Sequence, residues 1–531
     1  MQHFLHARGL SEGHKTGTQF ARSWKELAKR CRRTFFLDSQ PVKLSELCGT
    51  GRVTINILPD DVLLIIFDFY RADIMNYVGP TCAWHRLVQV CRRWRHVVFA
   101  SPARLGLHIV CTERTPVREL MDIWPPLPII IRYWLHSTLA SEYPIPSAIT
   151  ALEHRNRVHQ IQLSHVTRPL LDILATGMQE PFPALTMLEL WSDDEMAPVL
   201  PDTFLGGSAP RLQIISLEGI AFPALPKLLF STVNLVSLLL DKIPPDTTGY
   251  ISPQEMATGL SRLACLKFLR IDFLPPAFPS NVHQNPRQQT RAILPSLTWF
   301  EFQGVNEYLE DLISRIEAPL LDNIDIKFFD QITFDIPQLL QFITHSEKLN
   351  FPNEARMNFH SDFVRITLSP RRDTVGNFTL QVLCTVPLWQ VLSMVQICDQ
   401  AIPLLSSVQC LQICGGEHED SLREWQDNIE IAQWLELFYP FTAVASLHVT
   451  ENLGPFTASA LCEVTGRMAA EVLPALHNLF LEGPEPSEFW EGDIWQFTAA
   501  RRHCSLPVVV CRYKRDWEHN LEWAGHLEVD D

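Results

Sequence analysis

The stretch Leu185-Thr186-Met187-Leu188-Glu189-Leu190 carries an L-x-x-L-x-L pattern that recurs along most of this 531-residue chain. Further copies, in which Val, Ile or Phe can replace Leu, begin at residues 158, 212, 235, 266, 297, 321, 408, 444 and 476. The copies up to residue 321 start 23 to 31 residues apart. Since alternate residues of a strand face opposite sides, each copy predicts a short strand with one apolar face. Such units cannot bury that face alone and are expected to stack into a solenoid.

The spacing of these copies resembles that of leucine-rich repeats. Helices are predicted between the strands, for example over 252–263 and 308–316, which gives one strand and one helix per unit. The asparagine that usually follows the strand in this family is absent from every copy. The resemblance therefore implies an α/β fold, an irregular leucine-rich-repeat-like solenoid over residues 151–485. The alternative is an ordinary α/β domain whose parallel strands read as apolar runs.

The repeat pattern lapses at about residues 327–407. Here Leu349–Phe359, Phe363–Leu368 and Phe378–Leu383 alternate apolar and polar residues, as antiparallel strands do. Turn residues such as Arg371-Arg372-Asp373 separate these segments. We predict a strand-rich insert in this region, in the form of an added hairpin layer.

Upstream of the repeats, residues 57–98 predict two apolar helices. Pro59 suits the first helical position, and Asp60 and Asp61 follow where the helix dipole favours negative charge. The first helix is expected to bury a stripe at helical spacing formed by Val62, Ile65, Ile66 and Phe69. The second helix is expected to bury Trp84, Leu87, Val88, Cys91, Trp94 and Val98 and to end before Pro102. Its outward face is basic, with Arg86, Arg92, Arg93 and Arg95.

This hairpin resembles an F-box, on its Leu-Pro start, its Ile-Phe pair and its Val-Cys-Arg-Arg-Trp run. The resemblance implies binding to the adaptor subunit of an SCF-type ubiquitin ligase and, through it, to a cullin. The positions that it marks for adaptor binding are Leu58, Pro59, Ile66, Phe67, Val90, Cys91 and Trp94. The sequence departs from the family in the 22 residues between Phe67 and Val90, and in the lack of a tryptophan between Ser101 and Leu107. The alternative is a hairpin that packs only against its own domain.

The two patterns divide the chain into domains. An F-box-like helical domain is expected over 52–110, a Pro-rich linker over 111–150 and a C-terminal tail over 486–531. Residues 1–51 are predicted to be a flexible basic leader, because residues 1–50 hold nine Lys and Arg against four Asp and Glu. A nuclear-import patch or a transit peptide is the alternative for this leader. An F-box followed by irregular leucine-rich repeats is similar to the expanded F-box families of mushroom-forming fungi.

Composition favours a protein of the cytoplasm and/or the nucleus. The hydrophobic content of 46% is enough for large cores, yet no stretch approaches 18 uninterrupted apolar residues, so no membrane contact is expected. The 13 cysteines lack CxxC pairs and read as reduced thiols. A net charge of −16 despite the basic leader makes the body acidic, which argues against nucleic-acid binding.

No catalytic motif is present in the sequence. It contains no G-x-S-x-G elbow, phosphate loop, H-E-x-x-H helix or dinucleotide fingerprint. The cluster Cys410-x3-Cys414-x3-His418 alone has metal-like spacing, and half a site is weak evidence for zinc. We therefore expect a non-catalytic protein with no metal and no cofactor.

The solenoid predicts an exposed sheet face made of the residues between the motif leucines. Its central row is Glu189, Ser216, Leu239, Arg270, Glu301, Asp325, Gln412, His448 and Phe480, with flanking Met187, Trp191, Glu218, Asp241, Asp272, Trp299, Lys327 and Glu482. Acidic residues outnumber basic ones in this set, and aromatic residues are scattered among them. The hypothesis is a concave face that selects a basic segment of a protein target. The target-binding residues would be Glu189, Trp191, Asp241, Arg270, Trp299 and Glu301, unless an acidic chain simply places carboxylates everywhere.

The resemblances together predict a substrate-recognition subunit of an SCF-type E3 ubiquitin ligase. The F-box would bind the adaptor and the repeats would bind the protein target for ubiquitination. The alternative function is a protein-interaction scaffold, without ligase activity, in which the F-box-like hairpin is only a cap.

Overall fold

The structure is a computed structural model of the 531-residue chain. It describes residues 58–75, 83–112, 117–124, 126–134, 145–194, 196–244, 249–275, 291–329, 333–346, 348–370, 376–416, 431–464, 468–482, 491–515 and 521–526. The predicted leader, 1–51, and His418 lie outside these residues.

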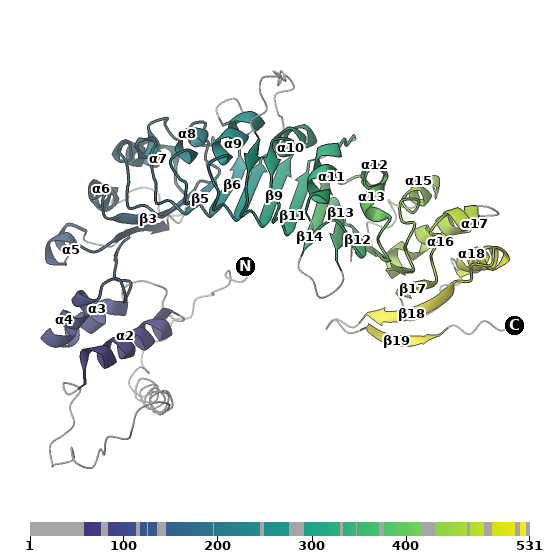
Figure 1. The fold of residues 1–531 in the computed structure, drawn as a ribbon, viewed down its shortest axis with the longest axis horizontal. Coiled ribbons are helices and arrows are strands. Elements are labelled where there is room, and N and C mark those ends of the chain that lie inside the picture. Colours follow the sequence, from purple (N-terminus) through teal and green to yellow (C-terminus); the bar gives the residue numbers. More distant parts are fainter. Residues whose placement is uncertain are drawn as a thin grey trace, which may run out of the picture. The chain divides into compact units, whose positions relative to one another are not determined.

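The repeats form one 17-stranded sheet, which is mostly parallel (Figure 1). Its first nine strands follow one another in chain order: β1 (Ile109–Cys111), β2 (Ile129–Trp134), β3 (Val158–Ser164), β4 (Met187–Trp191), β5 (Ile214–Glu218), β6 (Ser237–Ile243), β7 (Phe268–Phe273), β9 (Trp299–Gly304) and β11 (Asn323–Phe328). The remaining strands are, in spatial order, β14 (Asn377–Leu383), β13 (Phe363–Ser369), β12 (Glu354–Phe359), β15 (Cys410–Gly415), β16 (Ser446–Val449), β17 (Asn478–Glu482), β18 (Val509–Arg515) and β19 (Leu521–His526). A separate pair joins β8 (Ala292–Ile293) to β10 (Ile316–Glu317).

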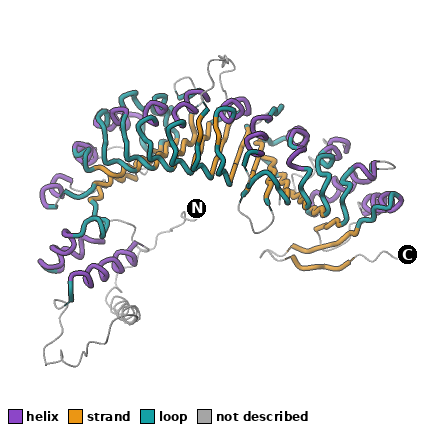
Figure 2. The backbone as a smooth tube through the Cα atoms, viewed as in Figure 1, coloured by secondary structure: helices purple, strands orange, loops and turns teal. Residues whose placement is uncertain are grey.

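Helices alternate with these strands and lie along one side of them, as Figure 2 shows. They are α5 (Val117–Ile123), α6 (Ile145–Glu153), α7 (Arg168–Gly177), α8 (Leu225–Leu229), α9 (Pro253–Leu260), α10 (Asn306–Ile313), α11 (Pro337–Thr344), α12 (Pro387–Gln400), α13 (Ile402–Leu405), α15 (Ile431–Glu436), α16 (Gly454–Cys462), α17 (Met468–Glu471) and α18 (Glu491–His503). This alternation of strands and helices over one long sheet confirms a repeat-like α/β fold that resembles leucine-rich repeats.

The core lies between the sheet and its helices. In β4, Leu188 and Leu190 are buried, whereas the intervening Glu189 is only half-buried. The motif residues align in register from strand to strand, so that their side chains form a continuous apolar row. One such row runs Leu188, Ile215, Leu238, Leu269, Phe300 and Ile324, and all of these side chains are buried. This row is the reason that the L-x-x-L-x-L copies stack.

Backbone hydrogen bonds join neighbouring repeats at the strand ends, where the asparagine typical of leucine-rich repeats is missing. The Ser192 amide donates to the Glu218 carbonyl over 2.9 Å, and the Gly219 amide donates to the Asp241 carbonyl over 2.9 Å. Gly219 has a φ of +65°, a conformation that glycine adopts without strain. The repeats that contain β4, β5 and β6 therefore remain joined beyond the last paired residues of these strands.

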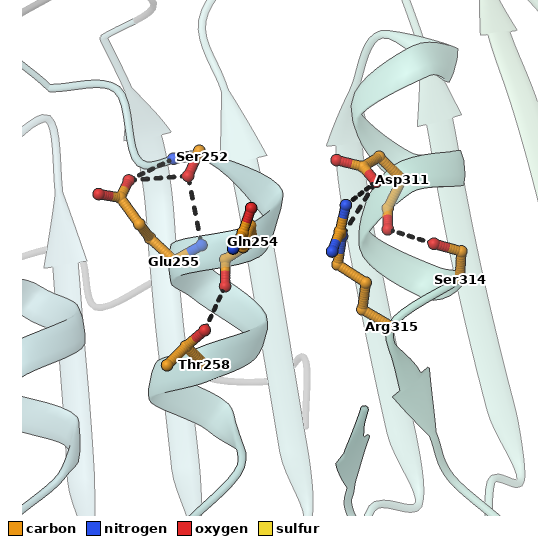
Figure 3. Close-up of polar contacts among 7 residues, drawn as sticks. All are labelled: Ser252, Gln254, Glu255, Thr258, Asp311, Ser314 and Arg315. Atoms are coloured by element: carbon orange, nitrogen blue, oxygen red, sulfur yellow. Dashed lines mark hydrogen bonds and ion pairs between the residues drawn. The ribbon is translucent and has the colours of Figure 1, made fainter. Parts of the chain in front are cut away.

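Side-chain caps fix the ends of the predicted helices at 252–263 and 308–316 (Figure 3). Ser252 Oγ accepts from the Glu255 amide over 3.2 Å, and the Ser252 amide donates to the Glu255 carboxylate over 3.1 Å. This capping box starts α9. After α10 ends, Arg315 contacts Asp311 at 2.8 Å, and Ser314 Oγ donates to the Asp311 carbonyl over 2.8 Å. Both predicted helices are thus confirmed, although each is shorter at its C-terminal end than expected.

The predicted strands of the 327–407 insert are confirmed, but they do not form a separate layer. Strand β13 pairs antiparallel with β12 and with β14. Strand β14 pairs with β11, and β12 pairs with β15, both parallel. The insert is therefore part of the same sheet, because each of its outer strands pairs with a strand of the flanking repeats.

The segments predicted to be a linker and a tail also carry sheet elements. Within 111–150, β2 pairs with β1 and β3, and α5 and most of α6 lie in the same segment. Within 486–531, β18 continues the parallel ladder from β17 and is preceded by α18. Both predictions were wrong, because the sheet runs through both segments. The sequence pattern did not detect these strands because neither segment carries the L-x-x-L-x-L signature.

The first N-terminal helix buries a different stripe from the predicted one. Helix α2 (Asp60–Met75) follows Pro59, whose carbonyl accepts from the Leu63 amide over 3.1 Å, so Pro59 occupies the cap position rather than the first turn. Its buried residues are Leu63, Leu64 and Phe67, whereas Val62, Ile65 and Ile66 are half-buried and Phe69 is exposed. The predicted second helix is two helices, α3 (Ala83–Val90) and α4 (Arg92–Ala100), which the extended residue Cys91 separates. The second predicted stripe is confirmed at Trp84, Leu87, Val88, Trp94 and Val98, which are buried, whereas Cys91 is half-buried.

Candidate interaction surfaces

The positions marked for adaptor binding separate into core and surface. Phe67 and Trp94 are buried, and their ring centroids lie 4.8 Å apart. Cys91 caps α4, because its Sγ accepts from the Trp94 amide over 3.4 Å. Phe67 and Trp94 thus pack α2 against α4, and Cys91 fixes the start of α4. Each of them therefore has a structural role in the hairpin itself.

The remaining marked positions are accessible. Val90 is 57% exposed and Pro59 is exposed, whereas Leu58 and Ile66 are half-buried. Phe69 was not among the marked positions, yet 43% of it is exposed. The sequence pattern placed Phe69 on the buried stripe, and the choice of stripe on an all-apolar helix cannot be made from periodicity alone.

The other candidate surface is the sheet face opposite the motif leucines, which we call the open face. Its central row is in register as predicted, from Glu189 on β4 through Ser216, Leu239, Arg270 and Glu301 to Asp325 on β11. Gln412, His448 and Phe480 continue the row beyond the insert. Each of these side chains is half-buried. The predicted alternation of buried and open residues is therefore present along the sheet.

Arg270 organises the centre of the open face. Its guanidinium forms an ion pair with Asp241 at 3.5 Å on one side and with Glu301 on the other. Trp299 Nε1 donates to the second Glu301 oxygen over 2.6 Å. Four of the six predicted target-binding residues thus lie in one network. They come from β6, β7 and β9, which are neighbours in the sheet.

The two other predicted residues lie apart from this network. Glu189 accepts a hydrogen bond from Gln162 over 2.8 Å, and Trp191 packs against His165 with ring centroids 4.2 Å apart. Both are on β4, and β5 separates them from β6. The predicted set is therefore two groups on one face.

Three carboxyls of the open face resist ionisation. Burial raises the pKa of Asp272 to about 7, and the nearby Asp241 carboxylate adds to this effect. Burial also raises the pKa of Asp241 and of Asp325, although Arg270 opposes it at Asp241 and Lys327 opposes it at Asp325. Asp272 and Asp325 were expected on this face but were not among the target-binding residues. Their environment depends on pairing across strands, which the sequence pattern does not give.

Aromatic rings flank the same centre. Phe268 and Trp299 stack with centroids 6.0 Å apart and an interplanar angle of 23°. The Arg270 guanidinium lies 5.6 Å from the centre of the Phe268 ring. An acidic centre beside a half-exposed aromatic pair can attract a cation and also bury apolar area of a partner.

The insert brings arginines to the open face. Arg365 on β13 donates to Gln381 over 3.0 Å from Nε, and its guanidinium lies 4.8 Å from the centre of the Phe363 ring. Arg356 on β12 donates to Gln412 over 2.9 Å and is exposed. The open face therefore changes from mainly acidic to basic between β11 and β12.

The cysteine pair of the suspected half-site cannot share a metal ion. Cys410 and Cys414 lie at four-residue spacing on β15, which separates their Cα atoms by about 13 Å. Zinc needs ligand atoms at about 2.3 Å. Among the residues that the structure describes, no group of three His, Cys, Asp or Glu side chains is arranged to hold a metal ion.

No protein-family model matches the chain, and no curated protein gives a significant sequence match. Within the described ranges, no helix combines the length and the apolar character that crossing a bilayer requires.

Proposed function

We propose that this protein is the substrate-recognition subunit of an SCF-type E3 ubiquitin ligase. The support for the ligase half is the F-box-like sequence of α2, α3 and α4, together with the exposed apolar residues Phe69 and Val90 on these helices. Exposed apolar side chains of this size suit a protein contact. The support for the receptor half is the open face, where a charged network and stacked aromatic rings lie together without helical cover.

The mechanism would be positional. The N-terminal helices would hold the adaptor, and the open face would hold the target. Catalysis would come from the conjugating enzyme that another subunit brings. Linking two binding modules raises the effective concentration of the target near that enzyme, which is the whole contribution required of a receptor.

Binding of purified adaptor subunit to the full chain tests the ligase half. Val90→Asp should abolish binding without unfolding the protein, because Val90 is 57% exposed and an aspartate there stays in water. Ile173→Asp is the matched control, since Ile173 is 45% exposed on α7 of the repeat domain. Trp94→Ala should also abolish binding, but by disrupting the hairpin.

An unmodified chain that fails to bind any adaptor would reject the ligase proposal. The protein would then be an interaction scaffold whose N-terminal hairpin is a cap. The burial of Phe67 and Trp94 against each other suits that second function as well, because both rings are already used inside the hairpin.

A further inference from the structure

We propose that the open face binds a protein segment that carries charges of both signs, with basic side chains over β7 and β11 and acidic side chains over β12 and β13. This inference deepens the target-binding half of the proposed function and does not depend on the adaptor. It replaces the expectation of a purely basic target segment.

At the acidic end of this surface, two carboxyls each have one oxygen without a hydrogen-bond donor, although Lys327 and Arg270 lie near them. Arg270 is already shared between Asp241 and Glu301. Asp272 and Asp325 each retain an Oδ1 atom that is shielded from solvent and lacks a hydrogen-bond partner. Shielded carboxylate oxygens without a donor are costly, and an incoming ammonium or guanidinium group would relieve that cost.

The arginines of the basic end also lack a direct ion-pair partner, although Arg365 lies near enough to Asp325 to favour its ionised form. Arg356 and Arg365 donate to the neutral side chains of Gln412 and Gln381. Neither arginine forms an ion pair with any residue of the described part of the chain. Both guanidinium groups therefore keep donors for a carboxylate of a partner.

The sheet register sets the distance between the two ends. From β11 the order is β14, β13 and β12, so Arg365 lies two strands away from Asp325 and Arg356 lies three strands away. Arg356 is in register with Asp325, so at about 4.8 Å per strand it lies about 14 Å away. Arg365 is in register with Lys327, two residues further along β11, so it lies about 12 Å from Asp325. Thr379 and Thr367, which pair between the two ends, are small and half-buried. A partner main chain can therefore pass closely over them.

These distances define the partner. In an extended segment, which rises about 3.3 Å per residue, the two opposite charges would be about four residues apart. A uniformly basic segment would satisfy Asp272 and Asp325 but would place positive charge against Arg365 and Arg356. Like charges in contact across an interface are strongly unfavourable, so the arginines exclude such a segment.

Binding of three synthetic peptides to the full chain tests the proposal. The first has two lysines and two glutamates separated by a Gly-Ser spacer, the second has the same composition with the charges alternating, and the third replaces the glutamates by lysines. We expect the first to bind at least about tenfold more tightly than either of the others. Asp272→Asn with Asp325→Asn, or Arg356→Gln with Arg365→Gln, should each remove this preference. Arg262→Gln is the control, because Arg262 is exposed outside the strands of the open face.

Equal or tighter binding of the all-lysine peptide would overturn the proposal in favour of a simple acidic surface. Failure of the separated-charge peptide to bind at millimolar concentration would also overturn it. A chain that binds the adaptor but ignores the order of charges in the peptides leaves the ligase proposal intact. A chain that prefers the separated-charge peptide but does not bind the adaptor rejects the ligase half alone.

Discussion

Gly219 lies so close to Ser192 that a β-carbon on the glycine would stand 2.3 Å from the serine carbonyl oxygen. This approach closes the turn after β5, where the Ser192 and Gly219 amides donate to the next repeat. Gly219→Ala should therefore force the backbone apart and lower the free energy of unfolding by more than about 2 kcal/mol. Urea denaturation measures this loss.

Gly207→Ala is the matched control for that substitution. Gly207 has a φ of +67°, almost the same as Gly219, but a β-carbon there would meet nothing within 4 Å. Only the backbone penalty remains, which is about 1–2 kcal/mol. Equal losses for the two variants would show that the contact with Ser192 is unimportant.

Three consecutive leucines on β6 should respond differently to truncation. Leu238 and Leu240 are buried against the helices, whereas Leu239 is half-buried on the open face. Leu238→Ala or Leu240→Ala should cost about 2–5 kcal/mol, because each leaves a cavity in the core. Leu239→Ala should cost less than about 1 kcal/mol. A stability series in urea over the three variants checks the orientation of the strand.

Because Trp94 packs inside the N-terminal hairpin, we expect its substitution to unfold the hairpin rather than to alter a binding surface. Trp94→Ala removes a buried ring that packs 4.8 Å from Phe67 and should destabilise the hairpin by about 3–5 kcal/mol. Proteolysis of the full chain should then cut within α3 or α4. Val90→Ala should leave the proteolysis pattern unchanged, and similar cleavage of both variants would contradict this assignment of core and surface.

The raised pKa of Asp272 predicts a pH-dependent stability. The folded state binds the proton with a pKa of about 7, above the ordinary 3.8, so the folded state holds more protons between these values. The stabilisation is full below about pH 3.8 and is lost as the pH rises through about 7. Asp272→Asn should thus stabilise the protein at pH 8 by about 2–4 kcal/mol, with a gain that shrinks toward pH 5. Unfolding midpoints of both proteins across this pH range are the measurement, and a gain independent of pH would reject the cause.

The repeats could be predicted from the sequence because their signal is local. In β4, for example, the alternation of Leu188, Glu189 and Leu190 gives both faces of the strand at once. The pattern failed where tertiary context decides. The run from Pro125 to Pro128 reads as a linker, yet Ile129 begins a strand of the sheet directly after it. The helix break at Cys91 could not be predicted in the same way, because no glycine or proline marks it in the sequence.

The residues that lie on the open face could be predicted from the sequence, but the interactions among them could not. Position within each strand identified Arg270 and Glu301 as neighbours on one side of the sheet. Their ion pair, and the charged groups that surround Asp272, depend on the register between strands about 31 residues apart in sequence. The antiparallel insert moved Arg356 and Arg365 onto the same face, and a pattern that treats the insert as a separate layer misses that juxtaposition.

The reversal at β13 has a consequence for how the chain folds. Up to β11, each new strand of the 17-stranded sheet can pair with the strand of that sheet that precedes it in sequence, since β8 and β10 pair with each other in a separate sheet. The next strand in sequence, β12, has no such edge, because β11 pairs with β14 instead. Strands β12, β13 and β14 must therefore assemble into a meander before either flanking block can extend through them. Stepwise growth from repeat to repeat is interrupted at this point. The two parallel blocks should behave as separate cooperative units, which unfold at different denaturant concentrations and meet at the meander.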